Sequence, residues 1–282
     1  MSSFYTAESG AKLHYKQTGA ESGPLIVCLH GLGGSTETYT PLLPLLPSKY
    51  RIILLDFPGF GQSSLPTTEK SLSINGHVSD VDEFIAHVQG SSDDAGKTKI
   101  ILFGHSLGTA VAMHYAAKRP ENVAGLVLFT SIQSAAHIPA ARERMLGLAA
   151  GTRKHGIAFA AEMAAKSNFP ADELRPINPN LRQAVAKAVA LSDSEGYAQT
   201  CEAVVGLDHK DPDYSRITAP TMLVAGDLDT LSPIAKSQTL SELIAGKSWV
   251  EVVKSGHQPI LEDTSAVAAA VNKLLQSIDS SG

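Results

Sequence analysis

The chain alternates short apolar runs with longer stretches in which apolar residues recur every three or four positions. The apolar runs predict strands, and they are Pro24–Leu29, Arg51–Leu55, Ile100–Phe103, Val123–Phe129, Thr221–Ala225 and Trp249–Val253. The predicted helices are Ser73–Gln89, Leu107–Lys118, a helix from Pro233, and a last helix with Val267, Val271, Leu274 and Ile278 on one face. Proline-spaced Thr40–Pro47 is expected to be partly helical, and polar Gly90–Lys97 to be a surface loop. Strands that alternate with helices predict an α/β fold with a mostly parallel sheet flanked by helices on both faces.

The first residues predict an antiparallel strand pair. Phe4–Glu8 and Lys12–Gln17 are joined by a Ser-Gly turn signal. In the second strand Leu13 and Tyr15 share one face, whereas His14 lies with two lysines on the other. This alternation predicts a half-exposed strand, with His14 on its polar side.

Residues 131–212 break the alternation of strands and helices, because no run there predicts a buried strand. The segment instead predicts the helices Ala140–Ala150, His155–Ser167, Leu181–Leu191 and Gly196–Val205. Breaks are expected at Gly151, Asn168–Pro170 and Arg175–Pro179. The segment leaves from the carboxyl edge of the predicted sheet, where open α/β sheets bind ligands. We therefore expect a core of residues 1–130 and 213–282 that carries an all-helical cap, residues 131–212.

Composition and charge narrow the class of protein. The 282 residues fit one large domain with an insertion, and a net charge of −5 gives no electrostatic case for binding nucleic acid or an anionic membrane. Two cysteines cannot form a disulfide framework, which is typical of a reducing compartment. The polar first ten residues do not resemble a secretion signal, and no apolar run approaches the roughly 20 residues that span a bilayer. These features favour a cytoplasmic protein without a membrane partner.

The strand Ile100–Phe103 runs into Gly104-His-Ser-Leu-Gly108, and a predicted helix follows at once. Gly-x-Ser-x-Gly between a buried strand and a helix is the context of a nucleophile elbow. Such a turn holds its serine in a backbone conformation that costs roughly 1–3 kcal/mol and exposes the hydroxyl at a helix N-terminus. Ser106 is therefore the candidate nucleophile.

A serine nucleophile needs a general base, and the base needs a carboxylate to orient it. Among ten histidines, His257 is the one that follows a late strand, whereas His105 adjoins Ser106 and should point elsewhere. The preceding strand ends in two candidate carboxylates, Asp227 and Asp229. Asp56 also ends a strand but precedes the elbow, and we expect it to hold its own turn.

These motifs together resemble the α/β-hydrolase family. The resemblance rests on His30-Gly-Leu-Gly-Gly34, Asp56-Phe-Pro-Gly-Phe-Gly-Gln-Ser63, Gly104-His-Ser-Leu-Gly108, Gly226-Asp-Leu-Asp229 with Pro233, and Gly256-His257. It implies the order Ser…Asp…His, with Asp229 as the acid because that family uses the second carboxylate of Gly-x-x-Asp. It also implies an oxyanion hole formed by the backbone N–H groups of Leu32 and Leu107. Leu32 stands where esterases of bulky alcohols have a third glycine, which favours small or medium acyl groups and lactones.

Within that family, the predicted cap resembles the 3-oxoadipate enol-lactonases. The similarity lies in Glu195-Gly-Tyr-Ala198, Cys201-Glu-Ala203 and Leu207-Asp208, and it marks Tyr197 as a candidate for substrate binding. One difference is the His30–Gly31 pair, which those lactonases often lack.

The leading hypothesis is a serine hydrolase that cleaves a carboxylic ester or a lactone, including an enol-lactone, through an acyl-enzyme on Ser106. One alternative is C–C bond hydrolysis of diketones by the same triad, and another is a small-ligand receptor of the same fold with slow turnover. The sequence shows no metal-ligand cluster and no phosphate-binding loop with lysine, so no cofactor is implied. The expected partner is a small ester or lactone.

Overall fold

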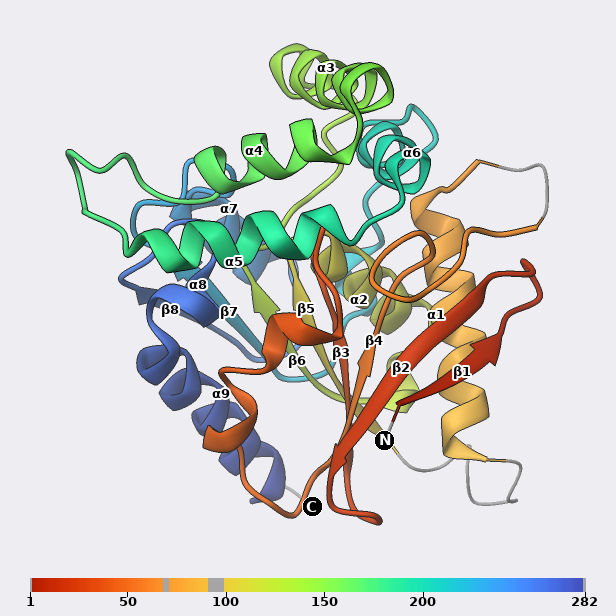
Figure 1. Ribbon diagram of the computed structural model, residues 1–282. Coiled ribbons are helices and arrows are strands. Elements are labelled where there is room, and N and C mark those ends of the chain that lie inside the picture. Colours follow the sequence, from red (N-terminus) through yellow and green to blue (C-terminus); the bar gives the residue numbers. More distant parts are fainter. Residues whose placement is uncertain (1, 68–70, 91–98, 281–282) are drawn as a thin grey trace.

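The protein is built on an eight-stranded sheet in the order β1-β2-β4-β3-β5-β6-β7-β8 (Figure 1). The computed structural model describes residues 2–67, 71–90 and 99–280. The strands are β1 Ser2–Thr6, β2 Lys12–Gly19, β3 Leu25–Leu29, β4 Arg51–Leu55, β5 Ile100–His105, β6 Val123–Phe129, β7 Thr221–Gly226 and β8 Ser248–Val253. β2 pairs antiparallel with β1 and β4, and the other neighbours are parallel. The expected mostly parallel sheet is confirmed.

Helices cover both faces of this sheet. They are α1 Ile74–Gln89, α2 Leu107–Lys118, α3 Pro139–His155, α4 Ile157–Ser167, α5 Pro179–Ala190, α6 Ser194–Val204, α7 Ile234–Leu243, α8 Pro259–Glu262 and α9 Thr264–Asp279. Short 3₁₀ turns add η1 Thr36–Tyr39, η2 Leu43–Leu45, η4 Pro120–Asn122 and η5 Tyr214–Arg216. Within the described ranges, no helix is both long enough and apolar enough to cross a membrane.

Alternation along the buried strands divides the core into two layers. Val27 and Leu102 pack in the cluster that contains α1 and α2. Ile26 and Phe103, one residue away on the same strands, pack in the cluster that contains α9 and η1. Because successive side chains of a strand point to opposite faces, continuous apolar runs are needed to fill both layers.

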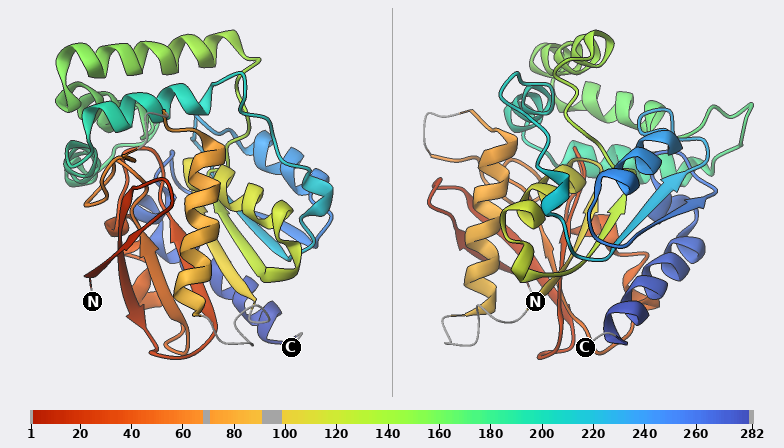
Figure 2. Two further views of the ribbon diagram at one scale, coloured as in Figure 1. Left: turned by 90° about the vertical axis from the view of Figure 1, so that its right-hand side faces the viewer. Right: turned by 180° about the vertical axis from the view of Figure 1, so that it is seen from behind.

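The four helices α3–α6 lie together above one end of the sheet (Figures 1 and 2). They occupy the chain between β6 and β7, and that segment contains no strand among the residues described there. The expected break at Gly151 is wrong, because α3 continues to His155 and ends at Gly156. A Cβ on Gly151 would lie 2.3 Å from Cε1 of Phe159, so this glycine permits close packing of α4 against α3.

The N-terminal hairpin also differs from expectation in one respect. His14 is not on an exposed face, since its exposed fraction is 0%. Its Nδ1 lies 2.7 Å from Oδ2 of Asp56, in the loop after β4, and that loop covers the polar side of β2. The run Gly90–Lys97 falls almost wholly outside the described residues, while η2 agrees with the partly helical Thr40–Pro47.

Candidate active site

Ser106 occupies the sharp turn between β5 and α2. Its backbone has φ 49° and ψ −111°, a left-handed conformation that costs a non-glycine residue roughly 1–3 kcal/mol. The flanking glycines make this turn possible, because a Cβ on Gly104 would lie 2.6 Å from the carbonyl oxygen of Gly108. A Cβ on Gly108 would lie 2.2 Å from the carbonyl oxygen of Leu29 in β3. The strained turn therefore holds the Ser106 hydroxyl beyond the end of the sheet.

A chain of hydrogen bonds links Ser106 to His257 and Asp229. Oγ of Ser106 lies 2.9 Å from Nε2 of His257, and Nδ1 of His257 lies 2.8 Å from Oδ2 of Asp229. The other oxygen of Asp229 accepts the backbone N–H groups of Leu231 at 2.8 Å and Ser232 at 2.9 Å. Burial alone would raise the pKa of Asp229, but His257 and these two donors hold it below its ordinary value. An ionised Asp229 fixes the proton of His257 on Nδ1 and leaves Nε2 free to accept the serine proton.

The neighbouring Asp227 has a different set of partners. Its carboxylate forms a two-pronged ion pair with Arg175, at 2.8 and 2.6 Å, and accepts the backbone N–H of Ser255 at 3.0 Å. The hydrogen bond to Arg175 lowers the pKa of Asp227, which stays ionised in this pair. Of the two carboxylates that the strand pattern left open, Asp229 is the one brought to His257.

Asp56 and His105 also have structural partners. Asp56 accepts the backbone N–H groups of Thr36 and Gln62, so it holds its own turn as expected. Nε2 of His105 donates to the carbonyl oxygen of His257 at 2.8 Å. Burial lowers the pKa of His105 to about 3, which keeps its ring neutral.

Glu262, at the end of α8, supports the loop that carries His257. Its carboxylate accepts the backbone N–H of Gly256 at 3.0 Å and that of Gln258 at 3.2 Å, the residues on either side of the histidine. Burial raises the pKa of Glu262 to about 7 despite these donors. Glu262 was not predicted as part of the site; in the sequence it is only an acid five positions after the candidate base.

The same loop touches the four-helix segment. The backbone N–H of His257 donates to the carbonyl oxygen of Asn168 at 2.8 Å, in the connection between α4 and α5. A Cβ on Gly256 would lie 2.7 Å from Cδ of Pro170. The connection and the histidine loop are therefore in direct contact.

Leu32 and Leu107 both lie beside Ser106. Leu32 is in the loop after β3, Leu107 begins α2, and both line the cavity that also contains Ser106. The ring of His30 stabilises the loop after β3. Its Nδ1 donates to the carbonyl oxygen of the next residue, and its Nε2 accepts the backbone N–H of Phe57. The backbone N–H groups of Leu32 and Leu107 are the candidates for holding a negatively charged oxygen at Ser106.

A cavity of about 1,620 Å³ opens above Ser106, between the sheet and the four helices. Its apolar lining includes Ile132, Met145, Leu148, Phe159, Phe169 and Tyr197. Among its charged residues, Arg144 and Lys236 form no ion pair in the part of the chain that the structure describes. Burial and the nearby Arg144 lower the pKa of Lys236, which lies close to Asp229 as well. Lys166, Glu162 and Glu173 also line the cavity without an ion pair in the described ranges, so it combines a wide apolar surface with unpaired charges of both signs.

No group of three or more His, Cys, Asp and Glu side chains within residues 2–67, 71–90 and 99–280 is arranged to hold a metal ion. The site offers a hydroxyl, an imidazole and a carboxylate linked in series by hydrogen bonds. This arrangement suits nucleophilic attack on a carbonyl.

Comparison with known proteins places these features in context. A family model described as alpha/beta hydrolase fold matches residues 24–264. A Bacillus subtilis protein provisionally named 2-succinyl-6-hydroxy-2,4-cyclohexadiene-1-carboxylate synthase is 26% identical over 280 residues, covering 97% of this chain and 98% of that protein. The 3-oxoadipate enol-lactonase 2 of Acinetobacter baylyi is 25% identical over 264 residues, covering 94% and 93%. The solved structure of a thermophilic esterase from Thermogutta terrifontis superposes with a TM-score of 0.84 at 23% identity, covering 99% of each chain. The resemblance to enol-lactonases is confirmed along nearly the whole chain.

Proposed function

The chain belongs to the α/β-hydrolase fold family, and from this premise we propose that it is a serine hydrolase that cleaves a carboxylic ester or a lactone. The observation that carries the proposal is the hydrogen-bonded series Ser106, His257 and Asp229, with distances of 2.9 and 2.8 Å. The strained backbone of Ser106 supports it, because such strain persists where the surrounding structure holds a residue for a task.

In the proposed reaction, Oγ of Ser106 attacks the carbonyl carbon while Nε2 of His257 takes the serine proton. Asp229 stabilises the imidazolium that forms. His257 then gives the proton to the departing alcohol oxygen as the ester bond breaks, which leaves an acyl-enzyme. A water molecule, deprotonated by His257, attacks the acyl carbon and releases the acid with regeneration of Ser106.

The negative oxygen of each tetrahedral intermediate would be held by the backbone N–H groups of Leu32 and Leu107. One such donor contributes about 10²–10³ to kcat where it has been removed by mutation. The N-terminal end of α2 adds a favourable electrostatic field at the same place.

We propose that residues 131–212 act as a cap over the core of residues 1–130 and 213–282, and select the substrate. The cap helices supply much of the cavity lining, including Tyr197 from α6. Acidic side chains line the cavity too, but Lys236 lies near Asp229 and has Arg144 beside it. A cation at Lys236, close to Asp229, favours an ester or lactone that carries a negative charge near the reacting carbonyl.

The test is hydrolysis of a panel of esters, lactones and enol-lactones, each in neutral and carboxylate-bearing forms. We expect sustained turnover, with Ser106→Ala reducing kcat by several orders of magnitude. Ser167→Ala is the matched control, because Ser167 also lines the cavity but belongs to α4, and it should keep near-normal activity. Turnover that is unaffected by Ser106→Ala would refute the assignment.

The panel also separates the two alternative functions. Activity confined to diketones would indicate C–C bond hydrolysis by the same residues. A single burst of product without further turnover would indicate a ligand receptor that hydrolyses slowly.

We also propose a cytoplasmic location. Cys28 and Cys201 are both buried and unpaired, which fits a compartment that keeps thiols reduced. Fractionation of cells that produce the protein should recover it with cytoplasmic markers, and recovery in a membrane or secreted fraction would contradict this placement.

A further inference from the structure

A second Ser–His–Asp series lies in the N-terminal hairpin, away from Ser106. Oγ of Ser2 lies 2.6 Å from Nε2 of His14, and Nδ1 of His14 lies 2.7 Å from Oδ2 of Asp56. His14 is 0% exposed and Asp56 is 1% exposed, whereas Ser2 is exposed. The order of groups, from an accessible hydroxyl through a buried imidazole to a buried carboxylate, matches that of the candidate active site.

The hydrogen bonds around Asp56 indicate which nitrogen of His14 carries the proton in the neutral ring. Its Oδ1 accepts the N–H of Thr36 at 2.5 Å, and its Oδ2 accepts the N–H of Gln62 at 3.0 Å as well as the bond from His14. Since an ionised carboxylate only accepts, Nδ1 of His14 must donate to it. When the ring of His14 is neutral, Nε2 is therefore the acceptor, and the hydroxyl of Ser2 donates to it. This is the arrangement that activates a serine for nucleophilic attack.

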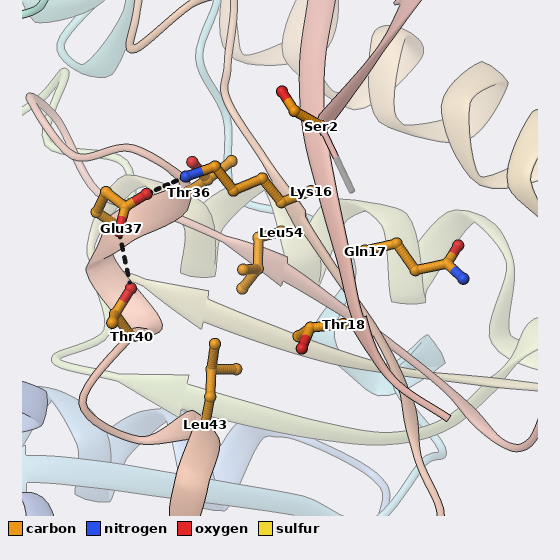
Figure 3. Close-up of a pocket in the computed structure, with 9 residues that line it drawn as sticks. All are labelled: Ser2, Lys16, Gln17, Thr18, Thr36, Glu37, Thr40, Leu43 and Leu54. Carbon is orange, nitrogen blue, oxygen red and sulfur yellow. Dashed lines mark hydrogen bonds and ion pairs between the residues drawn. The ribbon is translucent and has the colours of Figure 1, made fainter. Parts of the chain in front are cut away.

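The surface beside Ser2 can receive a small electrophile. A cavity of about 350 Å³ is lined by Ser2, Lys16, Thr36, Thr40, Leu43 and Leu54, among others (Figure 3). Lys16 is directly opposite Ser2 in the β1–β2 ladder, so both side chains stand on one face of the hairpin. Its ammonium is paired with Glu37 and lies in the same cavity, where it would offset negative charge on an attacked carbonyl or phosphonyl oxygen. This cavity shares no lining residue with the one above Ser106.

We propose that Ser2, His14 and Asp56 form a second nucleophilic centre, at which Ser2 is modified by small acyl and phosphonyl electrophiles. Oγ of Ser2 attacks the electrophilic centre and its proton passes to Nε2 of His14. A bond from Oγ to carbon or phosphorus forms as the bond to the leaving group breaks, and the leaving group departs with the electron pair. The product is a covalently modified Ser2, independent of any chemistry at Ser106.

The probe is a small alkyl phosphonofluoridate, which loses fluoride on reaction with a serine. Full-length Ser106→Ala protein removes the first candidate nucleophile, and peptide mapping by mass spectrometry locates the label. General-base assistance is worth about 10²–10⁴-fold, so Ser2 should react at least about 10²-fold faster than Ser64, an exposed serine whose side chain contacts no histidine. Ser2→Ala should abolish the label, and Ser3→Ala, the neighbouring serine in β1, should leave it unchanged.

Two further measurements test whether His14 is the general base for Ser2. His14→Gln should slow labelling of Ser2 to the rate of Ser64. Because this buried variant could fail to fold, the Ser106→Ala protein is also labelled in concentrated urea, where the hairpin is lost but Ser2 remains. Labelling that disappears in urea supports the proposal. Two outcomes would contradict it: labelling of Ser2 no faster than that of Ser64 in the folded protein, or labelling of Ser2 that is equally fast in urea. Either would show that the hydroxyl of Ser2 only forms a hydrogen bond to a structural histidine.

Discussion

Asp227 and Asp229 are two positions apart, yet the turn after β7 gives them separate environments. The N–H of Asp227 donates to Val253 in the neighbouring strand, and its side chain faces Arg175 at the surface. Asp229 is buried, with an exposed fraction of 5%, and its carboxylate is hydrogen-bonded to His257. A difference of two residues therefore separates an exposed ion pair from a buried partner of the candidate base.

The first prediction compares the two amide variants. Asp229→Asn should lower kcat by about 10⁴, the effect of the equivalent change in serine proteases, because an amide favours the wrong imidazole tautomer. Asp227→Asn should change kcat by less than about tenfold, since the side chains of Arg175 and Asp227 are 29% and 32% exposed and surface ion pairs contribute about 0–1 kcal/mol. Steady-state kinetics on an aryl ester measures both. The opposite ranking would transfer the role of acid to Asp227.

At the scale of elements, glycines decide how closely helices and strands approach. Gly108, in the first turn of α2, faces the end of β3, where a Cβ would lie 2.2 Å from the carbonyl oxygen of Leu29. Gly147 is inside α3, and a Cβ there would meet no atom within 4 Å. The same residue type is thus a packing requirement in one helix and an open position in another.

The second prediction uses this pair. Gly108→Ala should destabilise the protein by about 1–3 kcal/mol, because the methyl group overfills a backbone contact. Gly147→Ala should stabilise it by roughly 0.5–1 kcal/mol, because alanine loses less backbone entropy in a helix. Urea unfolding measures both, and equal effects of the two substitutions would contradict the packing argument.

The third prediction concerns α6, whose Tyr197 is 2% exposed and lines the large cavity. Tyr197→Leu should change the ratio of kcat/KM between large and small substrates by about 10–200-fold, the range available to a reshaped apolar pocket. Labelling of Ser106 by a small phosphonate should persist, because the sheet holds the nucleophile.

Leu207→Ala is the control for α6, because Leu207 is 77% exposed and lies beyond the end of that helix. It should leave the ratio of kcat/KM unchanged. If Tyr197→Leu lowers activity towards all substrates in parallel with Tm, then Tyr197 only stabilises the helices and does not select the substrate.

For the whole molecule, buried histidines make stability depend on pH. Burial lowers the pKa of His77 to about 4 and of His105 to about 3, and both rings are neutral in the folded protein. In the unfolded chain a histidine takes up a proton near pH 6.5. The unfolded state therefore binds more protons between about pH 6.5 and 4, and the free energy of unfolding falls as the pH is lowered through that range.

The fourth prediction isolates His77, whose two ring nitrogens have no hydrogen-bond partner in the described part of the chain. His77→Leu should reduce the loss of stability between pH 7 and 5, by up to about 1.4 kcal/mol for each pH unit below 6.5. Glu262 acts in the opposite direction, since its raised pKa favours the folded state as pH falls, but it is common to both proteins. Urea midpoints at a series of pH values provide the comparison, and parallel curves for the two proteins would disprove the role of His77.

Much of this architecture could be read from the sequence because its strongest signals are local. Buried strands such as Val123–Phe129 are continuous apolar runs, and the elbow is a strand, a short motif and a helix in direct succession. His14 was misplaced because alternation describes one strand and cannot show that the loop of Asp56 folds over it. Spacing could not choose between Asp227 and Asp229 either, and only the family resemblance and then the geometry separated them. Glu262 was missed because its role depends on backbone N–H groups, and an acid five positions after a histidine does not by itself indicate that role.

The hydrogen bond from His257 to Asn168 has a consequence for how such a protein can change over evolutionary time. The connection between α4 and α5 belongs to the segment that lines the cavity, but it also holds the backbone of the candidate base. An insertion or deletion in that connection would alter the cavity and the position of His257 together. New specificities should therefore arise more easily through side chains on α3 and α6, which contact the cavity without holding that loop. The junction at Asn168 is expected to keep its length among descendants that accept different substrates.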